Sequence, residues 1–163
     1  MMRILLYLIA FTISGFCVAQ TEIQTADRKY DPNIGAITFH YPGQYFSYPI
    51  LSLNSDDVLD LNFDDFSEGL RYFSYKVFLC DQDWTPSDIP VLEYLDGYET
   101  NEIVENNFSF NTRAQYTTHT LRIPNDNLRL KKSGNYILYV WDDDSQEPVL
   151  TRRFFMVENR VLV

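Results

Sequence analysis

Short runs of alternating apolar and polar residues are the feature that most constrains the fold of this chain. In residues 58–63 (VLDLNF), apolar side chains fall on one face, opposite Asp60 and Asn62. Such alternation is typical of a β-strand with one buried face. Residues 70–79 (LRYFSYKVFL) carry bulky groups on both faces, as in a strand covered on both sides. Residues 136–141 (YILYVW) predict a further central strand.

Turn residues such as Pro42-Gly43 separate these runs from other strand-like segments. Strands are also predicted at residues 34–41, 45–53, 103–110, 117–123 and 149–157. Pro49 is expected at an edge or at a strand start. Leu128 and Leu130 are expected to lie in a connection, and residues 142–148 are expected to form a hairpin tip. No convincing amphipathic helix accompanies them. We therefore predict an all-β, immunoglobulin-like antiparallel β-sandwich with one long ordered loop. Gly134 followed by Tyr136 on a late strand is typical of a tyrosine corner.

The long loop spans residues 80–97 (CDQDWTPSDIPVLEYLDG) and follows the strand at 70–79. Pro86 and Pro90 lack a backbone N–H and disfavour helix at the residues before them. Because the segment is rich in aromatic and apolar residues, we expect an ordered flap rather than a solvated loop. Trp84 and Tyr94 are expected to point inward and fasten this flap to the sheet. Truncation of Trp84 is then expected to destabilise the fold more than truncation of Tyr94.

The flap sequence resembles the signature of the plug protein family of the bacterial type IX secretion system. The resemblance extends in the family's order to Pro49-Ile50, residues 61–65 (LNFDD), 108–112 (FSFNT), 116–119 (YTTH), 133–136 (SGNY) and 151–157 (TRRFFMV). Family members are considerably longer, so the chain is similar to their N-terminal domain. The residues singled out as family-signature or contact residues are Cys80, Asp81, Asp83, Trp84, Pro86, Ser87, Tyr94, Gly97, Arg152 and Arg153.

The resemblance implies a non-enzymatic role. The family's plug seals the periplasmic opening of the outer-membrane type IX translocon, so the implied partner is that translocon. The implied location is the periplasm, associated with the outer membrane. The alternative is a periplasmic or secreted carbohydrate-binding β-sandwich module, in which Trp84, Tyr94 and Tyr98 would form an aromatic platform.

The N-terminus has the pattern of a signal peptide over residues 1–19. Arg3 provides the positive charge, an apolar stretch follows, and small residues precede a cleavage point after Ala19. We expect residues 20–33 to be an extended leader, residues 34–159 to be the sandwich, and residues 160–163 to begin a truncated following segment. Cleavage removes Cys17 and leaves Cys80 as the one cysteine, which we expect to be buried at a strand end.

Charge argues against a nucleic-acid partner. The chain has 13 basic and 23 acidic residues, a net charge of −10 and a pI near 4.5. Phosphate binding requires clustered Lys and Arg, and no such cluster occurs in the sequence. An acidic surface favours solubility and a partner with a basic patch.

Catalytic and metal-binding patterns are weak. His40 and His119 each lie inside an alternating strand, where a solvent-facing or hydrogen-bonded core histidine is the expectation. Acidic residues cluster at Asp64-Asp65, Asp81 with Asp83, and Asp142 to Asp144, without the spacing of a calcium loop. We expect these carboxylates to lie in solvated turns, to cap turns or to pair with Arg152 and Arg153. No enzyme, cofactor, metal site or small-molecule substrate is predicted.

Overall fold

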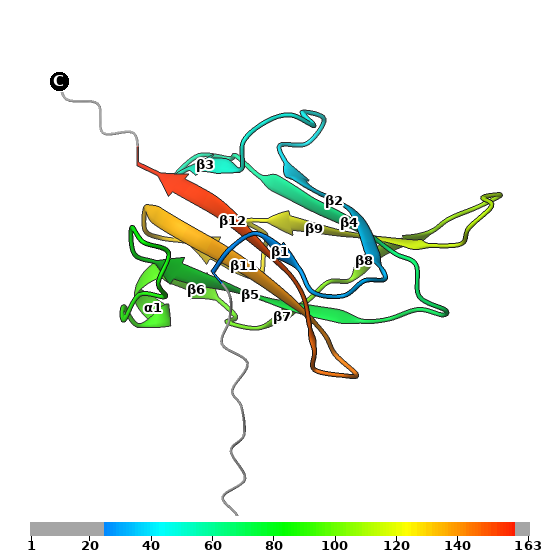
Figure 1. The fold of residues 1–163 in the computed structure, drawn as a ribbon. Helices are drawn as coiled ribbons and strands as arrows, with labels where there is room; N and C mark the ends of the chain where they lie inside the picture. Colours follow the sequence, from blue (N-terminus) through cyan, green and yellow to red (C-terminus); the bar gives the residue numbers. More distant parts are fainter. Residues whose placement is uncertain (1–24, 159–163) are drawn as a thin grey trace, which may run out of the picture.

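Two β-sheets lie face to face in the computed structural model, which describes residues 25–158 (Figure 1). The larger sheet has the order β1 (Arg28–Lys29), β12 (Pro148–Val157), β11 (Gly134–Asp142), β5 (Phe73–Cys80) and β7 (Asn101–Glu102), and β3 (Ile50–Ser52) pairs in parallel with the end of β12. The second sheet has the order β2 (Ile34–His40), β4 (Leu59–Asp65), β9 (Thr117–Ile123) and β8 (Glu105–Phe108). The predicted all-β antiparallel sandwich is confirmed.

A third, two-stranded sheet lies at one end of the sandwich. Its strands are β6 (Leu95–Gly97) and β10 (Leu128–Leu130), and the one-turn helix α1 (Val91–Tyr94) leads into β6. Within residues 25–158, no helix is long and apolar enough to cross a membrane. The predicted signal peptide and the segment 160–163 lie outside the described residues.

The alternating runs direct their apolar faces into the shared core. Leu59, Leu61 and Phe63 of β4 are completely buried, as their spacing predicted. Phe63 meets Phe73 of β5 edge to face at 5.3 Å between ring centroids, so the core joins the two sheets directly. Burying one such side chain contributes about 1.5–3 kcal/mol, which makes this contact layer a main source of stability.

Strand β11 is the centre of the larger sheet. It pairs along its length with β5 on one side and with β12 on the other. Its Tyr136 stacks on Phe154 at 5.3 Å, and the Tyr136 hydroxyl donates a 2.8 Å hydrogen bond to the carbonyl of Lys132. This bond to the backbone a few residues upstream has the form of a tyrosine corner, as the sequence indicated.

Three short elements differ from the predicted ones. The strand predicted at 45–53 is reduced to β3, because residues 41–48 form turns closed by their own hydrogen bonds. Leu128 and Leu130, predicted to lie in a connection, are buried strand residues of β10. The leader includes β1, which pairs with β12. Each element has only two or three residues, too few for a period of two to be visible.

One arginine joins four segments at one end of the sandwich. Arg71, just before β5, contacts both carboxylate oxygens of Asp65 at the end of β4, at 2.8 and 2.9 Å. The same guanidinium lies 2.7 Å from Asp31, in the linker before β2, and 3.3 Å from Asp142, at the end of β11. Asp65 and Asp142 are buried, so this cluster neutralises carboxylates that would be costly to bury alone.

The pKa of Asp65 reflects this arrangement. Burial raises the pKa of this carboxyl, but the hydrogen bonds from Arg71 and Ser67 and the charge of Arg71 outweigh burial and hold it below the ordinary value of 3.8. A carboxyl with a depressed folded-state pKa contributes stability above its unfolded-state pKa and loses it as the pH falls through the folded value. Asp65 therefore stabilises the fold at neutral pH through Arg71.

We predict that Arg71→Met lowers the free energy of unfolding at pH 7 by about 3–5 kcal/mol, because it leaves buried carboxylates without a counter-ion. Lys132→Met is the control, since Lys132 and its partner Glu93 both have exposed side chains, and should cost no more than about 1 kcal/mol. Urea unfolding measures both.

The pH dependence gives a second readout. Without Arg71, burial raises the pKa of Asp65 in the folded variant. Protonation of Asp65 as the pH falls therefore destabilises the folded variant less than it destabilises the folded wild type. The stability difference between Arg71→Met and wild type should therefore narrow as the pH falls from 7 towards 4. A difference that stays constant would show that Arg71 acts through packing alone.

Candidate functional site

The flap, residues 80–97, begins with a tight turn against the end of β5. The Asp81 N–H donates to the Thr85 carbonyl at 2.9 Å, and the Trp84 N–H donates to the Asp81 carbonyl at 3.0 Å. Asp83 accepts the Thr85 N–H at 3.1 Å, so its carboxylate caps the turn. The φ of Trp84 is +69°, a left-handed conformation that this turn imposes on a bulky residue. Two predicted residues, Asp81 and Asp83, thus have structural roles here.

Backbone bonds return the flap to the sheet just after this turn. The Ser87 N–H donates to the Leu79 carbonyl at 2.9 Å, and Cys80 forms an isolated bridge with Pro86. Asn135 of β11 adds a side-chain hydrogen bond to the Asp81 carbonyl at 3.0 Å. The first part of the flap is therefore fixed to β5 and β11.

Trp84 lies on the outer face of β12. The Arg153 guanidinium carbon is 4.2 Å from the centre of the Trp84 ring, and Phe155 meets the ring edge to face at 5.4 Å. Arg153 is itself held by a 2.6 Å hydrogen bond from its Nε to the Thr25 carbonyl. Trp84 is half-buried rather than buried, so it fastens the flap through surface contacts.

Tyr94 fastens the other end of the flap from inside. It is only 4% exposed and meets Tyr136 edge to face, with ring centroids 6.2 Å apart. Beyond it, β6 passes so close to β10 that a Cβ on Gly97 would lie 2.1 Å from the Asn127 carbonyl oxygen. With a φ of +111°, Gly97 also has a backbone conformation that favours glycine.

Cys80 is buried beneath the start of the flap. Burial raises the pKa of its thiol to about 11, and this effect outweighs the opposing charge of Arg153. A thiol with this pKa is almost entirely protonated at neutral pH and therefore a poor nucleophile. The predicted buried position is confirmed.

The structure brings most, but not all, of the predicted site residues together. The corner where the flap meets β5 and β12 holds Cys80, Asp81, Asp83, Trp84, Pro86, Ser87 and Arg153. Tyr94 and Gly97 lie instead by β6, and Arg152 donates hydrogen bonds to the carbonyls of Arg28 and Thr151. The flap rings do not combine into one sugar-binding platform: Trp84 is covered by Arg153, Tyr94 is buried and Tyr98 is exposed.

The predicted turn capping is confirmed, since Asp65 accepts the Ser67 N–H and Asp83 accepts the Thr85 N–H, but the predicted arginine partner of Asp65 is wrong. Asp65 binds Arg71 instead of Arg152 or Arg153, and Asp64 accepts a 2.6 Å hydrogen bond from the Thr118 hydroxyl. Asp142 is buried rather than solvated, because it accepts two turn N–H groups in addition to contacting Arg71. Among residues 25–158, no group of three or more His, Cys, Asp or Glu side chains could hold a metal ion.

Neither histidine lies in a catalytic arrangement. His119 is buried between Phe63, stacked on it at 5.2 Å, and Phe73, at 4.8 Å edge to face. Neither of its ring nitrogens has a hydrogen-bond partner among the described residues, and burial lowers its pKa. The expectation of a solvent-facing or hydrogen-bonded histidine is therefore wrong for His119. His40 is also buried, with Nδ1 on the Tyr41 carbonyl at 2.8 Å.

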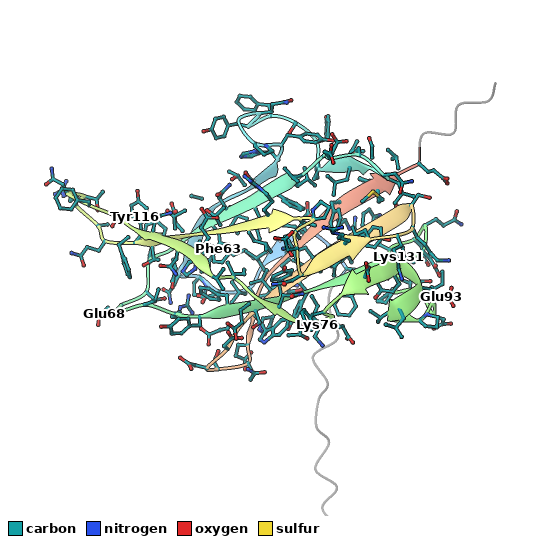
Figure 2. All side chains as sticks on the ribbon, turned by 180° about the vertical axis from the view of Figure 1, so that it is seen from behind. Phe63, Glu68, Lys76, Glu93, Tyr116 and Lys131 are labelled. Carbon is teal, nitrogen blue, oxygen red and sulfur yellow. The ribbon has the colours of Figure 1, made fainter. Side chains whose placement is uncertain are left out.

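A surface that the sequence analysis did not single out lies at the end of the molecule opposite the helix α1. Here the β8–β9 hairpin projects beyond the sheets (Figure 1), and Glu68 and Tyr116 mark the same end in Figure 2, far from Glu93 and Lys131. We call this surface, formed by residues 66–70 and 105–117, the hairpin end. Phe108 is 65% exposed and Phe110 is 93% exposed.

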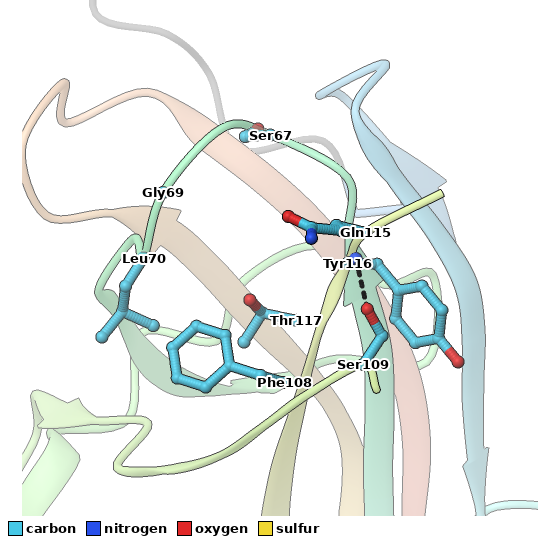
Figure 3. A pocket seen from close by; sticks show the side chains of 8 residues that line it. All are labelled: Ser67, Gly69, Leu70, Phe108, Ser109, Gln115, Tyr116 and Thr117. Atoms are coloured by element: carbon cyan, nitrogen blue, oxygen red, sulfur yellow. Dashed lines mark hydrogen bonds between the residues drawn. The ribbon is translucent and has the colours of Figure 1, made fainter. Parts of the chain in front are cut away.

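A cleft of about 390 Å³ opens within the hairpin end (Figure 3). It is lined by Ser67, Gly69, Leu70, Phe108, Ser109, Gln115, Tyr116 and Thr117. The Ser109 hydroxyl accepts the Tyr116 N–H at 2.9 Å, and the Ser109 N–H donates to the Tyr116 carbonyl at the same distance, so two hydrogen bonds join the hairpin arms beside the cleft. In the sequence, the alternation Phe108-Ser109-Phe110 was the feature that could have indicated two aromatic side chains on one face of this hairpin.

We predict that Tyr94→Ala costs about 3–5 kcal/mol of unfolding free energy, because it leaves a cavity against Tyr136. Trp84→Ala should cost about 1–2 kcal/mol, the worth of its cation–π and edge contacts. This order reverses the sequence-based expectation. Tyr98→Ala, at an exposed ring, is the control and should change stability by less than about 0.5 kcal/mol. Denaturant unfolding ranks the three variants.

Cys80 is predicted to resist a thiol reagent at pH 8 in the native protein and to react fully in denaturing urea. The Cys80→Ser variant corrects for any labelling of Cys17. Native labelling of Cys80 at the rate of the unfolded chain would contradict the buried position.

Comparison with solved structures shows a similar architecture in another protein. A hypothetical protein from Parabacteroides merdae, known from a crystal structure, is 29% identical with a TM-score of 0.76. The match covers 80% of this chain but only 33% of the P. merdae chain, so the present protein spans about a third of that relative's length.

A second solved structure and the search among curated proteins do not identify a family. The Pseudomonas fluorescens alkylpurine DNA glycosylase AlkC bound to DNA matches over 76% of this chain and 30% of its own, at 11% identity and a TM-score of 0.38, too low to show a shared fold. No match was found among curated proteins.

The decisive comparison is with protein families. Residues 34–158 match the family described as the type 9 secretion system plug protein 1st domain. The match covers the whole sandwich from β2 to the end of β12, together with the flap and the hairpin end. The chain therefore belongs to the family of type 9 secretion system plug protein first domains.

Proposed function

We propose that this chain acts, without catalysis, as the first domain of a plug that docks on the periplasmic opening of the outer-membrane type IX translocon and helps to seal it. The observation that carries this proposal is the family match over residues 34–158. Membership of this family supports a role in type IX secretion.

The surface chemistry supports a contact role. The two histidines are buried, away from the surface that a partner would meet. Large exposed apolar side chains, by contrast, are prominent, as expected of a protein that works by binding. The proposed location is the periplasm at the outer membrane, reached through a signal peptide over residues 1–19.

We assign the translocon contact to the hairpin end. Phe108 and Phe110 are exposed on a hairpin that reaches beyond the sheets, where a partner can approach without meeting the body of the domain. Exposed aromatic residues that enter a partner's pocket are frequent binding hot spots. The flap residues Cys80, Trp84 and Tyr94 are assigned a supporting role, since they fix the flap to the sheets.

The test is affinity purification from cells that carry the type IX translocon. Tagged wild-type protein should retain the translocon, and Phe108→Ser/Phe110→Ser should retain at least about tenfold less, equivalent to about 1.4 kcal/mol of binding. Leu92→Ser, at a similarly exposed residue on α1, is the control and should behave as wild type.

Equal unfolding midpoints must accompany this result, so that loss of binding is not loss of fold. Failure of the wild-type protein to retain the translocon would contradict the plug role. Retention that is unchanged in the double variant would keep that role but move the contact away from the hairpin end.

A further inference from the structure

The connection between β2 and β3 presents a second apolar surface, distinct from the hairpin end. Residues 41–53 (YPGQYFSYPILSL) contain no Asp, Glu, Lys or Arg, although 22% of the whole chain is charged. Phe46 in this connection is fully exposed, and Tyr45 and Tyr48 are both more than 70% exposed. In Figure 1 the connection rises above the sheets beside β2 and β4.

The connection is a built structure and not a loose loop. The Tyr41 hydroxyl donates to the Ile50 carbonyl and so closes the base, and the Ser47 hydroxyl accepts the Tyr41 N–H at 2.9 Å. His40 meets the Tyr45 ring edge to face at 5.0 Å. Because these contacts hold the backbone of the connection and the Tyr45 ring before any partner binds, less conformational entropy remains to be lost on binding.

This surface continues onto the strand from which the chain leaves the domain. Ile50 of β3 is the register partner of Phe155 in β12, and both side chains are exposed. Val157, the last residue of β12, is exposed two positions further on, and the Leu53 N–H donates to its carbonyl at 2.7 Å. We call the set Tyr45, Phe46, Tyr48, Ile50, Phe155 and Val157 the exit face.

We propose that the exit face is the docking surface for the domain that follows this first domain in longer members of the family. The P. merdae relative, of which the matched domain is 33%, shows that a large part of such a chain lies outside this sandwich. A domain that follows β12 starts next to Val157, whose register partner is Ser52 of β3, four residues along the chain from Tyr48. The proposal rests on the architecture of the family and does not require binding to the translocon.

The size and charge of the exit face fit this occupant. Its three exposed loop rings present roughly 500 Å² of mostly apolar surface, which suits one side of an interface between domains of a chain. The connection at 41–53 carries no charge, and Arg153, two residues before Phe155, is engaged by the Trp84 ring and the Thr25 carbonyl. On a chain of net charge −10, this face therefore suits an apolar partner rather than a basic one. Aromatic side chains are also the type enriched at the centres of such contacts.

The first test is a superposition on the P. merdae crystal structure. The segment that superposes on residues 41–50 should have at least half of its side-chain surface buried by parts of that chain outside the matched domain. A segment that faces solvent throughout would overturn the proposal.

The second test uses the present chain to distinguish other occupants. Wild type, Phe46→Ser/Tyr48→Ser and the control Val104→Ser are compared by sedimentation velocity and by flotation with phosphatidylcholine vesicles. The proposal predicts monomers that do not float, for all three proteins. A dimer that only Phe46→Ser/Tyr48→Ser abolishes would assign the face to a second copy instead. Flotation lost only in that variant would assign it to the bilayer.

Discussion

The ion cluster around Arg71 is the interaction on which the hairpin end depends. One guanidinium contacts Asp31, Asp65 and Asp142, which come from the linker before β2 and from the ends of β4 and β11. The last two strands belong to different sheets, so the cluster closes the sandwich at this end. A single cation can stabilise these carboxylates because backbone N–H groups also donate hydrogen bonds to them. The Ser67 N–H donates to Asp65, and the N–H groups of Asp144 and Ser145 donate to Asp142.

The turn at residues 66–70, which lines the cleft, directly follows Asp65. The pairing of β4 with β9 then links Asp65 to the projecting hairpin. Asp65 is the register partner of Thr117, where β9 leaves the projecting hairpin. The exposed Phe108 and Phe110 are thus presented on a hairpin whose base is fixed by buried charge. By comparison, the flap is held by rings at both ends, Trp84 on Arg153 and Tyr94 on Tyr136, with a backbone approach that requires glycine at position 97.

Much of the sandwich could be predicted because its strands are long enough to show a period of two. β4, β9 and β11 occur where they were predicted. β5 begins at Phe73 rather than at residue 70, and Leu70 and Tyr72 are exposed instead of covered. β10 could not be predicted in this way, since Leu128–Leu130 is too short and its partner β6 lies 30 or more residues earlier.

The candidate site was less predictable for a related physical reason. The pairing of Arg71 with Asp142 spans 71 residues, and nothing local in Asp142 to Asp144 distinguishes a buried carboxylate from a solvated one. The aromatic composition of the flap indicated that Trp84 and Tyr94 fasten it to the sheet. Which of the two rings is buried depends on the residues of β11 and β12 that each ring contacts, and the flap sequence does not reveal these residues. Phe108 and Phe110 lay within a recognised block, yet their exposure depends on how far the hairpin extends beyond its neighbours.

The role proposed for this domain is to present the hairpin end to a partner. Hydrogen–deuterium exchange of the domain, alone and with saturating detergent-solubilised translocon, tests it most directly. Slower exchange in residues 66–70 and 105–117 on binding, with little change across α1, is the predicted result. Unchanged exchange in both segments at saturation would contradict the claim.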